Sequence, residues 1–216
     1  MAFYVGLDLG QSTDYTALAV IEDASKVNPA GGTEKALHLR HLERYPLGRP
    51  YTEMADAVAR LVRDERLVTE IHAPGEPTVY RRPPELVVDA TGVGKAVVDM
   101  LRERGLRFKA VTITGGDKTK YSARGASVPK RDLVSALEVP FNSGTLKVAE
   151  GLELWPALKA ELLTFRRKIN LKTAHDSYEH WRASDHDDLV LAAALACWWA
   201  AKRGRNLGPV KKPEGW

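Results

Sequence analysis

The segment at residues 189–201 restricts the fold more than any other part of this sequence. On a helix it is apolar on almost every face, and it carries alanine at Ala192, Ala193, Ala194 and Ala196. A helix that is apolar all round is buried, and alanines let it approach a sheet closely. The segment is shorter than the roughly 18 residues of a membrane span. It therefore predicts a central helix packed against a sheet, and no membrane partner.

Strand-like and helix-like segments precede this helix. β-prone runs lie at 3–9, 16–21, 37–42, 86–88 and 109–113, and helical segments at 52–68, 93–104, 131–137 and 152–165. The first two runs are expected to form a hairpin. The order predicts an α/β fold, a mixed β-sheet flanked by helices on both faces. Residues 24–34, 72–84 and 114–131 are expected to be loops or irregular.

Length and composition indicate one domain. The 216 residues show no internal repeat or linker, so residues 1–203 are expected to form the domain and 204–216 a C-terminal tail. Cys197 is the single cysteine, which excludes an intrachain disulfide and a cysteine-based zinc site. The start leads straight into a strand, so no signal peptide and an intracellular location are expected. A net charge of +4 tolerates a polyanionic partner without requiring one.

Two aspartates end apolar runs. Asp8 closes the first run between Gly6 and Gly10, and Asp89 closes the run at 86–88. A carboxylate at such a place is costly to bury unless it is paired or bound to a metal, although a strand-end aspartate can also cap a turn. The glycines and lysine at 92–95 do not complete a phosphate-binding P-loop, which needs a glycine at 89 and a hydroxyl at 96.

A second pair of carboxylates, Asp187 and Asp188, opens the apolar helix. Acidic residues favour a helix N-terminus through capping and the dipole. Two adjacent carboxylates at the buried end of a helix nevertheless need a counter-charge, which a metal supplies. They point about 100° apart, and Asp187 is favoured as the primary ligand without excluding Asp188. His186 is interpreted as a surface histidine near the cap, with proton transfer as the alternative.

Basic residues cluster in the segment 114–131, between the run that Asp89 closes and the apolar helix. They can contact backbone phosphates, or they can simply be solvated. They are Lys118, Lys120, Arg124, Lys130 and Arg131.

Four motifs together resemble the nuclease domain of phage terminase large subunits, within the RNase H-like superfamily. They lie at 6–10, 88–94, 128–134 and 186–192. The resemblance implies an RNase H-like fold, with two Mg²⁺ or Mn²⁺ ions bound by Asp8, Asp89 and Asp187 with Asp188 alongside. Oxygen ligands without a thiolate also favour these metals over zinc. It further implies that residues 128–131 lie near DNA.

By this resemblance the chain is expected to be a metal-dependent endonuclease that hydrolyses phosphodiesters of double-stranded DNA. Expected partners are a packaging ATPase, a portal or a small terminase subunit, in the host cell cytoplasm if the gene is phage-encoded. A full large subunit also carries an ATPase with Walker motifs, which this sequence lacks. The chain is thus interpreted as an excised domain or a stand-alone nuclease.

Three other classes share parts of the pattern. The actin and sugar-kinase superfamily uses similar Gly-Asp-Gly loops but needs two copies of the fold, and ATP binding would identify it. A Holliday-junction resolvase or transposase-type enzyme would prefer branched DNA. A non-catalytic DNA-binding or assembly module would show no metal-dependent cutting.

Overall fold

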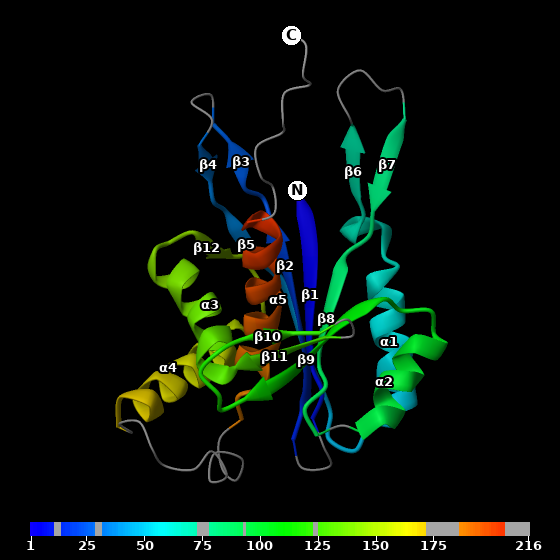
Figure 1. Cartoon of the computed structure of the whole chain (residues 1–216), viewed down its shortest axis with the longest axis vertical. Helices are drawn as coiled ribbons and strands as arrows, with labels where there is room; N and C mark the ends of the chain where they lie inside the picture. The colour runs from blue at the N-terminus through cyan, green and yellow to red at the C-terminus, as the bar shows by residue number, and fades with distance from the viewer. Residues whose placement is uncertain are drawn as a thin grey trace.

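A mixed sheet forms the middle of the molecule (Figure 1). The computed structural model describes residues 1–10, 14–28, 32–72, 78–92, 94–122, 125–171 and 186–205. In these ranges the sheet has eight strands in the order β10-β11-β9-β8-β1-β2-β5-β12. They are β1 (Ala2–Asp8), β2 (Thr16–Asp23), β5 (Leu37–Tyr45), β8 (Glu85–Asp89), β9 (Phe108–Thr114), β10 (Lys120–Tyr121), β11 (Gly125–Pro129) and β12 (Leu146–Val148). The β1–β2–β5 part is antiparallel, and β1, β8, β9 and β11 are parallel.

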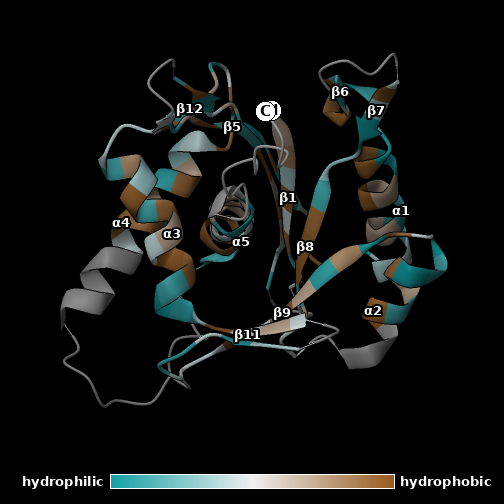
Figure 2. Ribbon diagram, turned by 45° about the horizontal axis from the view of Figure 1, so that its top comes forward, coloured by the Kyte–Doolittle hydropathy of each residue, from teal (hydrophilic) through white to brown (hydrophobic). Residues whose placement is uncertain are grey.

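Helices cover both faces of the sheet, which confirms the predicted α/β architecture (Figures 1 and 2). One face is covered by α1 (Tyr51–Val62) and α2 (Gly94–Glu103), near the short 3₁₀ helix at Glu65–Leu67. The other carries α3 (Lys130–Asn142), α4 (Trp155–Leu171) and α5 (Asp188–Arg205). Each face has its own apolar core. Among the described helices, none is long and apolar enough to cross a membrane.

The apolar helix α5 lies against the sheet as its sequence predicts. Every residue from 189 to 198 is buried. A side chain at Gly6 of β1 would meet the backbone carbonyl of Ala192, so the strand and the helix are in direct backbone contact. Such contact needs glycine on one element and small residues on the other. The helix extends to Arg205, slightly beyond the expected domain boundary, and residues 206–216 lie outside the described part of the chain.

Three segments expected to be loops or irregular contain short strands instead. β3 (Lys26–Val27) pairs with β4 (Thr33–Glu34), and β6 (Thr69–His72) pairs with β7 (Val79–Arg82). Both hairpins are largely exposed, so neither needs the apolar alternation by which a strand is recognised. The predicted basic loop at 114–131 also contains β10 and β11.

Candidate active site

Asp8 and Asp89 leave the sheet side by side. They end the adjacent parallel strands β1 and β8, whose register pairs Leu7 with Val88. Both side chains are buried, with the residues 8% and 7% exposed. Asp89 Oδ1 accepts a hydrogen bond from the backbone N–H of Thr91 at 2.7 Å, which fixes the carboxylate beside Asp8. The topology thus brings together two aspartates that are 81 positions apart in the chain.

The two aspartates at the start of α5 have different partners. Lys130 Nζ, at the start of α3, lies 2.5 Å from Asp187 Oδ2. Arg44 Nε, on β5, donates to Asp188 Oδ2 at 2.7 Å. The Asp187 side chain is 30% exposed and that of Asp188 only 6%. Asp187 is therefore the more accessible of the two, and Asp188 is held inside by an arginine.

Arg44 and Glu161 belong to the site although the sequence analysis did not select them. The Arg44 guanidinium contacts Glu161 of α4 as well as Asp188. Glu161 Oε2 accepts the backbone N–H groups of Leu189 and Val190, at 3.1 and 3.2 Å, and so caps α5 from another helix. One pattern in the sequence could have indicated Arg44. It lies two residues after the apolar Leu42 in a strand, so its side chain shares the face of the sheet that packs against the core.

His186 is a surface residue near the helix start. Its side chain is 52% exposed, and Nδ1 lies 4.0 Å from Asp188 Oδ1. The imidazole also packs edge-on against Tyr15, at 4.8 Å between ring centroids. This placement agrees with the expected cap-region histidine.

Burial raises the pKa values of both strand-end carboxyls, Asp8 and Asp89. Burial holds the pKa of Asp8 well above its usual range, and the charges of Asp89, Asp187 and Asp188 raise it further. Burial also raises the pKa of Asp89, against hydrogen bonds from Thr91 and the charge of Lys130. A positive charge added near Asp8 would therefore be stabilised.

The two carboxyls that pair with Arg44 also have raised pKa values. Burial raises the pKa of Asp188 in spite of the arginine. Burial, together with the charge of Asp188, raises the pKa of Glu161 to about 7. The single guanidinium of Arg44 thus pairs with two buried carboxyls, and its charge does not fully offset the effect of burial on either pKa.

The donor chemistry fits a hard divalent cation, but the described residues do not assemble a complete ligand set. Carboxylate oxygens are the ligands that Mg²⁺ and Mn²⁺ prefer, and Asp8 and Asp89 supply them from neighbouring strands. Within the described ranges, no group of three or more His, Cys, Asp or Glu side chains is arranged to hold a metal. Asp187 stands beside the pair but is bound by Lys130.

Most of the predicted DNA-binding residues lie next to Lys130. Arg131 Nη1 lies 2.9 Å from Asp117 Oδ1, and Nη2 donates to the Asp117 backbone carbonyl at 2.8 Å. These bonds fasten the β9–β10 loop to the start of α3. Lys118 and Lys120 are exposed on or beside this loop, and Arg124 lies outside the described residues.

The fold agrees with solved nucleases, although the sequence matches no protein-family model and no curated protein. The large terminase nuclease from thermophilic phage G20c aligns with 90% of this chain and 80% of its own, with a TM-score of 0.51 and 17% identity. The chain has the fold of a large terminase nuclease. The predicted RNase H-like architecture is therefore confirmed.

Two further structures align with lower TM-scores. The same G20c nuclease with bound zinc gives 0.49 at 20% identity, over 90% of this chain and 79% of that one. The RuvC structure of Thermus thermophilus gives 0.39 at 16% identity, over 94% and 96%.

Proposed function

We propose that this protein is a divalent-metal-dependent DNA endonuclease resembling the terminase nuclease. The observation that carries the proposal is the pair of buried carboxylates, Asp8 and Asp89, at the ends of neighbouring strands. Asp187 and Asp188 stand at the start of α5, and Lys130 and Arg44 hold them in place. Burial raises the pKa of Asp8, and the charges of Asp89, Asp187 and Asp188 raise it further. Buried carboxylates that repel one another are expected where a cation is bound, and the terminase fold is a fitting scaffold for this chemistry.

In this proposal Asp8 and Asp89 hold Mg²⁺ or Mn²⁺ at the sheet edge, and Asp187 joins them when it is released from Lys130. Two such ions, when bound, lower the pKa of a water and stabilise the leaving oxygen of a phosphodiester. Arg44 and Glu161 fix the start of α5, which positions both aspartates. Once Lys130 no longer pairs with Asp187, its ammonium can bind the phosphate that enters.

The proposed substrate is double-stranded DNA. Lys130 contacts Asp187, and Arg131 follows it in α3. Together with the exposed Lys118 and Lys120 they would bind backbone phosphates, which gives affinity without reading sequence. A packaging ATPase, a portal or a small terminase subunit is proposed as the partner that delivers the DNA.

A plasmid-nicking assay with Mg²⁺, Mn²⁺ or EDTA tests the proposal. Wild type should nick the plasmid with either metal and not with EDTA, and Asp8→Asn should abolish cutting in a protein that remains folded. Asp99→Asn is the matched control, because Asp99 is an exposed carboxylate on α2 paired with Arg102. Normal cutting by a well-folded Asp8→Asn protein would disprove the assigned site.

A further inference from the structure

A group of aromatic and basic side chains lies on the α5 side of the sheet, away from the carboxylates. We call it the Tyr121 surface. It consists of Tyr121 on β10, Lys109 on β9, and Trp199, Lys202 and Arg203 on α5. None of these residues was among those that the sequence predicted to bind DNA.

The aromatic rings of this surface contact its cationic side chains. Tyr121 is 55% exposed and stacks on the buried Trp198, with centroids 6.4 Å apart and planes 13° apart. Lys202 Nζ lies 5.5 Å from the centroid of the Tyr121 ring. Lys109 Nζ lies 5.7 Å from the centroid of the Trp199 ring. Rings attract ammonium groups in this geometry, so both lysines, each half-buried, are held beside the rings.

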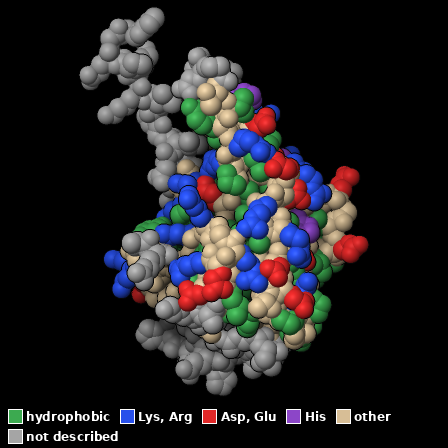
Figure 3. Space-filling model, turned by 90° about the vertical axis from the view of Figure 1, so that its right-hand side faces the viewer, with side chains coloured by type: hydrophobic (Ala, Val, Ile, Leu, Met, Phe, Trp, Pro, Cys, Tyr) green, Lys and Arg blue, Asp and Glu red, His purple; other side chains and the backbone are tan. Residues whose placement is uncertain are grey.

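Few carboxylates neutralise this surface. Trp199 Nε1 donates to Glu85 at 2.7 Å, and Glu85 also pairs with Arg82 and Arg203. Among the described residues, no carboxylate forms an ion pair with Lys109 or Lys202. Arg82, Lys109, Lys202 and Arg203 thus face one carboxylate. On the right-hand face of the molecule basic and acidic side chains are interspersed (Figure 3).

The Tyr121 surface is within reach of DNA bound at the carboxylates. Tyr121 pairs with Ala126, Ala126 with Val111, and Val111 with Asp89. Three steps between strands amount to roughly 14 Å. Along α5, the ten residues from Asp188 to Trp198 rise about 15 Å. Since a strand of duplex DNA rises about 3.4 Å per nucleotide, either path corresponds to roughly four base pairs.

We propose that the Tyr121 surface binds the backbone of duplex DNA about four base pairs from the bond that is cut. The identification of the polyanion as DNA rests on the proposed function. Lys109 and Lys202 bind phosphates, and the Tyr121 hydroxyl is placed to donate to a third, as tyrosines do at DNA backbones. The surface would hold the duplex beyond the basic residues around Lys130.

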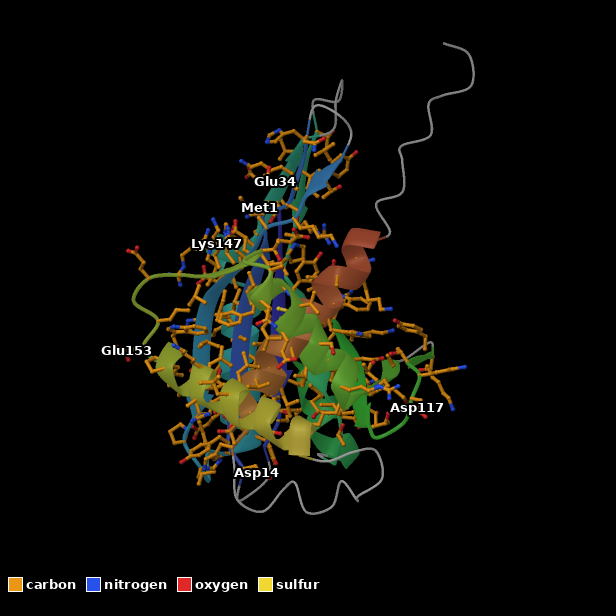
Figure 4. The ribbon with its side chains drawn as sticks, turned by 90° about the vertical axis from the view of Figure 1, so that its left-hand side faces the viewer. Met1, Asp14, Glu34, Asp117, Lys147 and Glu153 are labelled. Carbon is orange, nitrogen blue, oxygen red and sulfur yellow. The ribbon has the colours of Figure 1, made fainter. Side chains whose placement is uncertain are left out.

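Binding of a 30-base-pair duplex, measured by fluorescence anisotropy in EDTA over a series of salt concentrations, tests the proposal without cleavage. The test variant is Lys109→Ala/Lys202→Ala. The matched control is Lys35→Ala/Lys147→Ala, which removes two exposed lysines at the opposite edge of the sheet. Figure 4 shows Lys147 on the side of the molecule away from Asp117, which lies three positions before the first residue of β10. Lys109→Arg/Lys202→Arg keeps the charge.

The test variant should lower the slope of log affinity against log salt by about 1.8, the value for two lost phosphate contacts. The control and the arginine variant should keep the wild-type slope. Equal slopes for the test variant and the control would overturn the proposal, as would tighter binding of single-stranded than of duplex DNA. A plasmid assay run beside it separates the two claims. If the test variant lowers the salt slope but the wild type cuts no plasmid, the nuclease proposal is contradicted. If the wild type cuts and the test variant keeps the wild-type salt slope, only the role of the Tyr121 surface is contradicted.

Discussion

Lys130 Nζ lies 2.5 Å from Asp187 Oδ2 and so joins the first residue of α3 to the residue before α5. The ammonium also lowers the pKa of Asp89, against the effect of burial. One lysine thus offsets part of the negative charge of two aspartates from different motifs.

Removing this charge should slow cleavage. We expect Lys130→Ala to lower the single-turnover rate about 100-fold, the typical loss when one group that stabilises transition-state charge is removed. Lys130→Arg should retain most of the rate, since the positive charge remains. Lys147→Ala, an exposed lysine on β12, is the control. An unchanged rate in Lys130→Ala would show that the lysine only balances charge in the metal-free protein.

The main expected effect of removing Arg44 is a loss of stability. Arg44→Ala leaves Asp188 and Glu161 buried without their cation, and breaking a buried ion pair in this way costs about 3–5 kcal/mol. The free energy of unfolding from urea titration at pH 8 should fall accordingly. Adding Asp188→Asn and Glu161→Gln to Arg44→Ala should recover much of the loss, because no buried charge then lacks a partner. A loss as large in the triple variant would indicate that packing of the arginine, and not its charge, is responsible.

The sequence predicted the parts of the site that depend on local pattern. Asp8 and Asp89 interrupt apolar runs, and the sheet places such strand ends together. The 187–188 pair stands at the start of a helix that must be buried. Arg44 and Glu161 were missed because their contact joins residues 117 positions apart, and no spacing in the chain encodes it.

The short strands were missed for a different reason. β11 is a run of small residues without apolar alternation, and its place in the sheet comes from backbone pairing with β9. Gly125 allows that pairing, since a Cβ there would meet the Ala110 carbonyl. Long-range pairing of this kind follows from the assembled sheet and not from the segment itself.

Glu161 should make stability depend on pH. Its pKa is about 7 in the folded protein against an ordinary value of 4.5, so the folded state binds more protons between these values. The free energy of unfolding should therefore fall as pH rises from about 4.5 to 7, by no more than about 3 kcal/mol from this group. Glu161→Gln should flatten the profile, with the remainder due to Asp8, Asp89 and Asp188. The exposed Glu53, changed to Gln, should leave the profile as it is.

Asp8 should oppose stability without metal and support it with metal. Its pKa is raised by burial and by three neighbouring carboxylates, so at pH 8 its ionised form destabilises the fold. Asp8→Asn should therefore raise the melting temperature in EDTA. Mg²⁺ at 100 times its dissociation constant should stabilise wild type by about 2.7 kcal/mol, and this increase should vanish in Asp8→Asn. Thermal unfolding with and without Mg²⁺ measures both effects. An equal Mg²⁺ shift in both proteins would mean that the ion binds elsewhere, because a site built on Asp8 cannot keep its affinity when the carboxylate becomes an amide.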